Sequence, residues 1–292
     1  MTELQVWVTV TVLACLILIL LFDWIDMTVA GLLSVSALII FGILSQKDML
    51  NVVSSGGGVL ALLFGGMVVA RTLTPTGVFE HVGARFLILT RGSGKRFLVG
   101  LMLLIAPVCA FLPNATVVIL LAPVIIRVAV ALEVDIVAPM ILAAIISNSA
   151  GLLTLVGDPA TFLVGSAMGM TFIQYLNRVA LGGLLTLVAL TPLLPRVTKD
   201  IWRVNRTLPA EIAVPPLKEP LLGGLALLLL VVMMLLFLFG ELLPVQIVPP
   251  SAAIVVCSVA LLIVYAAKVE PVQKVLGDID WKTLIFIACM FV

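Results

Sequence analysis

The sequence predicts an all-α polytopic membrane protein. Two features of its composition support this fold class. Hydrophobic residues make up 63% of the 292 residues and charged residues only 11%, whereas soluble domains carry about 25% charged residues. The mean hydropathy is +1.34, and the apolar residues are grouped in runs long enough to cross a bilayer. The lipid bilayer is therefore the expected surroundings of most of the chain.

The remaining composition excludes several other classes of protein. The net charge is +1, so nothing indicates a nucleic-acid partner. Each of the four cysteines lies alone in an apolar run and no CxxC pair is present, which argues against disulfides or a metal site. No cofactor is expected apart from a coupling Na⁺ or H⁺. The first residues, MTELQVWVTV, have no basic region before the apolar run, so we expect a retained first span rather than a cleaved signal peptide.

A membrane span requires about 20 mostly apolar residues. The full spans predicted on this criterion are residues 4–22, 28–45, 57–74, 178–195, 219–240 and 250–267. A further span is expected to start at Trp281.

Two segments between residues 97 and 177 depart from this simple pattern. Residues 97–126 carry no charge but are interrupted by Pro113 and Asn114, so we expect 97–131 to form a re-entrant hairpin. Residues 136–177 contain one charge and the stretch ISNSAGLLTLVGDPATFLVGS. Because backbone leaves helical geometry at membrane depth only where protein or a wet cavity supplies hydrogen bonds, these small, polar and helix-breaking residues predict a broken helix that lines a solute site.

The basic residues predict the orientation, because cytoplasmic loops are enriched in Lys and Arg. With the N-terminus outside and 136–177 crossing once, the basic segments 75–96, 196–218 and 268–282 all lie inside. Of the sixteen basic residues, only Lys47 and Arg178 then fall outside. The alternative of two ordinary spans, with Asp158 in a loop between them, would move 196–218 outside. We therefore expect a multi-pass protein of the cell (inner) membrane with cytoplasmic basic loops.

An internal repeat is the second organising feature. Residues 27–69 and 250–292 align without gaps, mainly in hydropathy: a span, a polar linker and a second span. The predicted topology makes the two copies inverted, which is typical of alternating-access secondary transporters. We predict a first repeat over 1–195, a cytoplasmic linker over 196–218 and a truncated second repeat over 219–292, which lacks a second hairpin and broken helix.

The hairpin and the broken helix also resemble a known family. FLPNATVVILLAPV (residues 111–124), ISNSAGLLTLVGDPATFLVGSA (146–167) and LTPTGVFEHVG (73–83) resemble the ion transporter superfamily, in its arsenite-permease and sodium/proton-antiporter branch, also called citrate-transporter-like. The resemblance implies that the hairpin tip and the unwound helix form half of a central site, and that the second repeat supplies the other half.

Carried over residue by residue, the resemblance implies a binding site for a substrate or ion. Its predicted members are Asn114 and Thr116 at the tip, and Ser147, Asn148, Ser149, Gly151, Thr154, Gly157 and Asp158 in the unwound segment. Half-helix N-termini suit anions, whereas half-helix C-termini and free carbonyls suit Na⁺ or H⁺. We expect the two glycines to allow positive φ and a close approach of backbones.

Asp158 has two interpretations. A carboxylate near the middle of a membrane is costly and suggests coupling to Na⁺ or H⁺. Asp before Pro is also a good helix N-cap, and Asp158 precedes Pro159. Asn114 and the 147–149 segment likewise have structural alternatives, in capping and in helix packing.

The sequence thus predicts a secondary active transporter of small inorganic ions, by arsenite-type efflux or sodium/proton antiport. A carboxylate or sulfate carrier and an inactive, incomplete transporter fragment remain alternatives. An intramembrane aspartyl protease would need two acidic residues at membrane depth and a zinc protease two histidines, but the chain has one of each, so we expect no enzyme. A homo-oligomer or a second half-transporter chain would complete the pathway.

Overall fold

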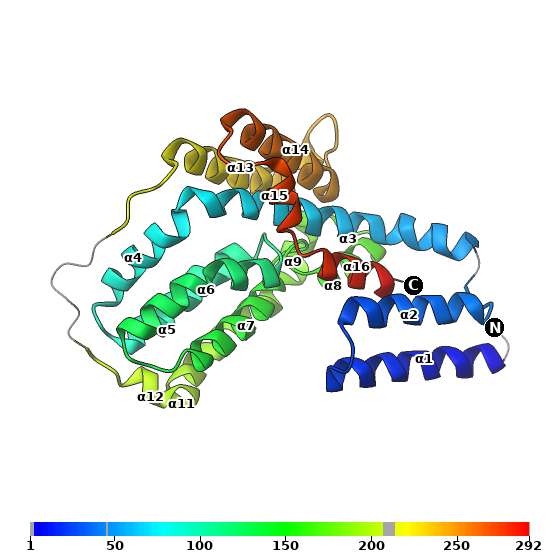
Figure 1. Ribbon diagram of the computed structural model, residues 1–292, viewed down its shortest axis with the longest axis horizontal. Coiled ribbons are helices and arrows are strands. Elements are labelled where there is room, and N and C mark those ends of the chain that lie inside the picture. The colour runs from blue at the N-terminus through cyan, green and yellow to red at the C-terminus, as the bar shows by residue number, and fades with distance from the viewer. Residues whose placement is uncertain (1–2, 45, 207–213, 292) are drawn as a thin grey trace. The chain divides into compact units, whose positions relative to one another are not determined.

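The computed structural model describes residues 3–44, 46–206 and 214–291. These residues form helices and connecting turns, without a β-strand among them, and the chain is an all-α polytopic membrane protein (Figure 1). In the described part, six apolar helical segments are long enough to cross a membrane: Gln5–Phe22, Gly56–Thr76, Asn114–Ala131, Ala180–Val197, Pro220–Leu242 and Pro249–Ala267.

The chain divides into two compact units. Residues Gly65–Asp278 form one, here called the central unit, and the described residues before and after them form the other, the terminal unit. Helix α3 (Gln46–Leu73) contributes its first part to the terminal unit and its last part to the central unit.

The terminal unit is built around α2 (Met27–Ile40), which packs against α1 (Glu3–Phe22) and α16 (Trp281–Met290). Asp26 caps α2 by accepting a hydrogen bond from the Thr28 N–H and pairs with Lys282 at 2.5 Å. Within this unit α1 buries little of its surface, and Trp7 is 70% exposed. A helix of this hydropathy with so much apolar exposure is suited to lipid contact.

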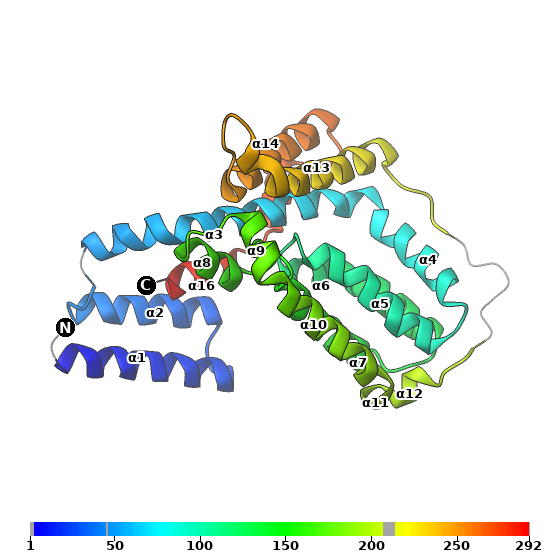
Figure 2. The same cartoon turned by 180° about the vertical axis from the view of Figure 1, so that it is seen from behind.

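The central unit has α6 (Asn114–Ala131) near its middle. It packs against α4 (Val78–Thr90), α5 (Gly94–Cys109) and α7 (Val137–Gly151). Figure 1 shows α5, α6 and α7 running side by side. Helix α10 (Ala180–Leu190) lies along α7, as Figure 2 shows. The core here is aliphatic and aromatic, with Phe97, Leu101 and Ile125 fully buried.

A second pair of helices in the central unit is α13 (Pro220–Phe239) and α14 (Pro249–Ala267). The end of α3 approaches α14 closely, because a Cβ at Gly65 would lie 2.7 Å from the Ala253 carbonyl oxygen. The shorter elements are η1 (Thr74–Thr76), α8 (Pro159–Ala167), α9 (Phe172–Arg178), η2 (Thr191–Leu193), α11 (Leu194–Val197), α12 (Lys199–Trp202), η3 (Gly240–Leu242) and α15 (Val272–Gly277).

An ion-pair network joins the end of α3 to the segment around α15. Arg71 Nη2 lies 3.1 Å from Glu270 Oε1, and Arg71 Nε donates to Asp278 at 3.0 Å. Lys274 also pairs with Glu270, at 2.6 Å. The side chains of Arg71 and Glu270 are only 14% and 9% exposed, so this network is largely shielded from solvent.

The Glu270 network makes stability depend on pH. Burial raises the pKa of the Glu270 carboxyl, but hydrogen bonds from Lys274 and Arg71 outweigh it and hold the pKa below its ordinary value of 4.5. A carboxyl with a lowered pKa stabilises the fold fully above its unfolded pKa and loses this contribution as the pH falls through the folded pKa. We expect the difference in thermal stability between wild type and Glu270→Gln to shrink below pH 4.5. A difference independent of pH in melting experiments would contradict this.

The long helices agree with the spans predicted from hydropathy. Segments 4–22, 57–74, 178–195, 219–240 and 250–267 each coincide with an apolar helical segment of spanning length. The predicted span 28–45 is α2, which ends earlier, at Ile40. The interruption at Pro113 is the turn between α5 and α6.

Three expectations were wrong in detail. Residues 75–96, taken as a loop because of their charges, contain the amphipathic helix α4, which buries Ala84, Phe86 and Leu87. The polar linker expected before residue 57 is helical from Gln46, within α3. The segment 136–177 is interrupted twice, because α8 ends at Ala167 before α9 begins.

Candidate functional site

The tip of the α5–α6 hairpin is a short turn closed by proline. Helix α5 ends at Cys109, and Pro113 occupies the N-cap position of α6 with extended backbone (φ −55°, ψ 132°). Proline cannot donate a hydrogen bond and restricts the preceding residue, so it separates the two helices. Asn114 is consequently the first residue of α6, with its backbone N–H among those that lack an intrahelical acceptor.

The helix break lies between α7 and α8. Helix α7 ends at Gly151, and α8 begins at Pro159, which stands at the first helical position. Asp158 is the N-cap residue in extended conformation (φ −141°, ψ 140°). Its half-buried carboxylate lies near the N–H of Ala160 without reaching capping geometry.

Thr154 ties the broken segment to the hairpin tip. Its buried hydroxyl donates to the Ala110 carbonyl oxygen, one residue beyond α5. The Thr154 hydroxyl oxygen in turn accepts from the N–H of Gly157 at 3.1 Å. One threonine side chain therefore satisfies backbone groups of both non-helical segments, as a buried polar side chain must.

Gly157 lies where two helix ends meet. A Cβ at this position would lie 2.6 Å from the Gly151 carbonyl oxygen and 2.9 Å from that of Cys109. These carbonyls belong to the last residues of α7 and α5, and the last carbonyls of a helix lack intrahelical partners. Two partially negative helix ends thus converge at one glycine.

The side chain of Asn114 lies beside this point. Its Nδ2 lies 3.4 Å from Asn148 Oδ1, and a Cβ at Gly151 would be only 2.8 Å from Nδ2. Asn114 Oδ1 is buried and has no hydrogen-bond partner among the described residues. Leaving such an acceptor unsatisfied costs about 1–3 kcal/mol, so Oδ1 is suited to receive a cation or a donor.

The other predicted site residues are less directly placed. Thr116 is half-buried in the first turn of α6. The hydroxyls of Ser147 and Ser149 donate to carbonyls of their own helix, those of Ala144 and Ile145, both at 2.9 Å. The structure therefore brings together Asn114, Asn148, Gly151, Thr154 and Gly157, whereas the two serines bond locally within α7.

Comparison with known proteins gives the family. The family model described as citrate transporter matches residues 17–292, nearly the whole chain. The chain belongs to the citrate transporter family. The citrate-transporter-like assignment made from the hairpin and the broken helix is therefore confirmed.

The relatives of this citrate transporter family protein include two named as uncharacterized transporters. It is 36% identical over 279 residues to an uncharacterized transporter of Synechocystis sp., covering 94% of this chain and 62% of the relative. It is 28% identical over 287 residues to an uncharacterized transporter of Mycobacterium bovis, covering 98% and 66%. The P protein of Homo sapiens is 30% identical over 200 residues, 66% of this chain and 24% of that protein. The chain thus spans less than two thirds of the length of its first relatives.

The structure corrects one sequence expectation about this family member's site and adds groups to it. Neither Gly151 nor Gly157 has a positive φ; the glycines with positive φ in the described residues lie elsewhere. What matters at Gly151 and Gly157 is the absence of a side chain, which allows neighbouring atoms to approach closely. Tyr175, whose hydroxyl donates to the Leu152 carbonyl oxygen at 3.2 Å, was missed. The Thr171–Gln174 capping box that starts α9 was the only local signal near Tyr175.

Proposed function

We propose that this chain supplies half of the binding site of a secondary active transporter, at the junction of the hairpin tip and the broken helix. The observation that carries the proposal is the buried Asn114 Oδ1, which has no partner among the described residues. An acceptor left open beside two converging helix ends is a ready ligand for a hard cation.

The helix ends at this junction carry partial charges of both signs, which supports a site that binds a cation and an anion. The C-terminal ends of α5 and α7 present carbonyl oxygens, which suit a coupling Na⁺ or H⁺. Helices α6 and α8 begin at Asn114 and Pro159, and helix N-termini favour negative charge. A coupling cation and a small transported ion would therefore find complementary backbone groups at the same junction.

Small inorganic ions are our first proposal for the transported solute, by arsenite-type efflux or sodium/proton antiport, as a permease or antiporter. None of the predicted site residues is a Lys or Arg, which does not favour a multivalent anion. The second candidate is a carboxylate such as citrate, and the description of the matching family favours it.

Asp158 is proposed as the coupling residue. It is half-buried at the start of α8, and its carboxylate does not complete a cap. This geometry favours the ion or proton role over the purely structural one. The second half of the site is proposed to come from a second copy of this chain or from another half-transporter chain. The proposed orientation has the N-terminus outside and the basic loops in the cytoplasm.

The test is flux into proteoliposomes that hold this chain, driven by Na⁺ or proton gradients, with arsenite and citrate as solutes. We expect Asn114→Ala to lower cation-coupled flux about tenfold or more, because a hydrogen-bond acceptor to a charged group contributes about 1.5–3 kcal/mol. Asp158→Asn should abolish the dependence on one of the two gradients.

Ser149→Ala is the matched control, since the Ser149 hydroxyl bonds within its own helix. It should leave flux unchanged. Equal flux in wild type and Asn114→Ala would refute the proposed site. Inserted, folded protein that moves no solute would refute autonomous transport by this chain.

A further inference from the structure

The turn between α4 and α5 is basic and is held against a distant segment of the central unit. The N–H of Gly94 donates to the Val204 carbonyl oxygen at 2.9 Å, and the N–H of Arg206 donates to that of Gly92 at 2.9 Å. Ser93 and Asn205 form an antiparallel bridge between these bonds. The turn is therefore fixed by backbone bonds rather than by its own charged side chains.

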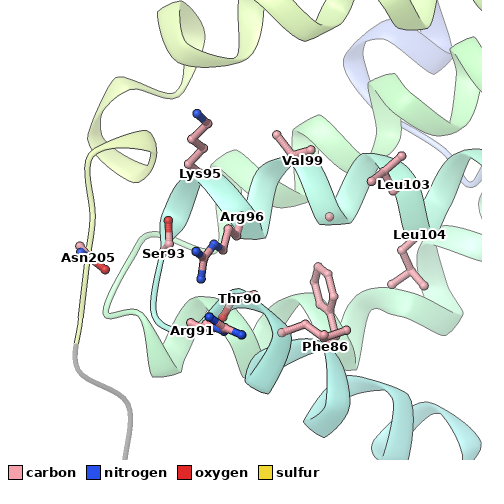
Figure 3. Close-up of a pocket in the computed structure, with 12 residues that line it drawn as sticks. Phe86, Thr90, Arg91, Ser93, Lys95, Arg96, Val99, Leu103, Leu104 and Asn205 are labelled. Carbon is pink, nitrogen blue, oxygen red and sulfur yellow. The ribbon is translucent and has the colours of Figure 1, made fainter.

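A pocket of about 870 Å³ opens next to this turn, between α4 and α5. Figure 3 shows that one end is basic, with Arg91 and Arg96, and that the wall toward the other end is apolar, with Val99 and Leu103. The two ends therefore differ in chemistry.

The basic end carries charge that the protein does not neutralise. Arg91 and Arg96 are exposed, and neither takes part in an ion pair between described residues. The neighbouring Arg206 is paired with Glu133 at 3.0 Å, and Lys95 lies over the Trp202 ring at 5.6 Å. Two guanidinium groups are left to face the pocket, and guanidinium binds phosphate in a bidentate manner.

Arg91 is also in an unfavourable backbone conformation. Its φ of 48° lies in the left-handed region at the C-cap of α4, where glycine is the usual residue. A non-glycine residue at such a position is worth relating to function. A glycine at position 91 would relieve the backbone strain but would remove the guanidinium group from the pocket.

The apolar wall has the length and exposure expected for a lipid chain. Leu89 and Leu103 are each 71% exposed. Leu103 follows Lys95 by two helical turns, about 12 Å along α5 at 1.5 Å per residue. Such an exposed apolar surface continuing from a basic cluster is unsuited to a free, hydrated anion but suits an amphiphile.

We propose that this pocket binds an anionic phospholipid, with the headgroup phosphate on Arg91 and Arg96 and an acyl chain along Leu89, Val99 and Leu103. The charge of the pocket complements anionic lipid headgroups at the membrane surface. This lipid site is separate from the proposed transport site and does not depend on it.

The experiment places the chain in nanodiscs with equal amounts of phosphatidylglycerol and phosphatidylcholine and measures the co-purified lipids by native mass spectrometry. The test variant is Arg91→Gly with Arg96→Gln. The matched control, Arg196→Gln with Arg203→Gln, removes two exposed basic charges outside the pocket. Each basic side chain near an anionic surface contributes about 1 kcal/mol, or about fivefold. We expect enrichment of phosphatidylglycerol to fall about 25-fold in the test variant and to persist in the control.

A melting temperature and a competition experiment separate loss of the lipid site from unfolding and from binding of a soluble anion. Arg91→Gly should keep or raise the melting temperature, since glycine relieves the left-handed backbone, so lost lipid cannot be ascribed to unfolding. Equal retention of both lipids by wild type, or equal losses in test and control variants, would overturn the proposal. So would displacement of phosphatidylglycerol by glycerol phosphate at equal concentration, which would assign the pocket to a soluble anion.

Discussion

Gly157→Ala is expected to abolish transport and to lower the free energy of unfolding by about 1–3 kcal/mol, as overpacking of a filled site does. The added methyl group would lie 2.6 Å from the Gly151 carbonyl oxygen and 2.9 Å from that of Cys109. Both neighbours are backbone atoms at helix ends, which cannot rotate away as a side chain can. The two helix ends would have to separate, and with them the carbonyls proposed to face the cation.

Gly182→Ala is the matched control for this substitution. Gly182 lies in α10, and outside its own stretch of helix no atom lies within 4 Å of its ideal Cβ position. Alanine inside a helix should therefore stabilise the protein by about 0.5–1 kcal/mol. Thermal unfolding in detergent and flux in proteoliposomes measure both effects. A fully active and stable Gly157→Ala variant would show that the close approach of α5 and α7 is not required.

Arg71→Gln is expected to cost about 2–3 kcal/mol of stability. Removing one partner of a buried ion pair leaves the other charge uncompensated, at a cost of about 3–5 kcal/mol for full burial, and we reduce this figure because Asp278 is 47% exposed. The guanidinium joins Glu270 and Asp278, which lie about 200 residues away in sequence. Its loss should release the segment around α15 from α3.

A double-mutant cycle measures the interaction energy between Arg71 and Glu270 apart from the effect of each side chain alone. The combination Arg71→Gln with Glu270→Gln should be less destabilised than the sum of the two single changes, because the buried carboxylate is no longer left alone. Arg85→Gln, an exposed change on α4, should alter stability by less than about 0.5 kcal/mol. Strictly additive losses in urea or thermal unfolding would show that the contact between Arg71 and Glu270 contributes nothing.

Local signals carried much of the fold prediction. The spans followed from hydropathy, and Pro113 and Pro159 marked the starts of α6 and α8, because proline favours the start of a helix, where its missing N–H is not needed. Helix α4 was missed because its charges suggested a loop. Its apolar residues Ala84, Phe86 and Leu87 face the core while the charged ones face outward, a pattern of amphipathicity that the charge count concealed.

For the site as well, local residue types predicted one part, and the packing of distant segments decided the rest. The residue types at the hairpin tip and the break suggested polar backbone chemistry, and the family comparison supports that assignment to a transporter. The partners of Asn114 and Thr154 could not be read from the chain, because Asn148 and Ala110 lie 34 and 44 residues away in sequence. The importance of Gly157 came from neighbouring backbone atoms rather than from its own φ.

The amino-acid sequence by itself determined the membrane class, the helical spans, the position of the hairpin turn and the helix break, and the family. These depend on hydropathy and on proline, properties that act within one turn or one span of the chain. Only the tertiary structure decided that Asn114 faces α7 with an open acceptor, that Arg71 binds Glu270, and that the basic turn after α4 borders a pocket. These depend on which distant segments pack together, and a pairing of distant segments is set by the fit of side chains in three dimensions.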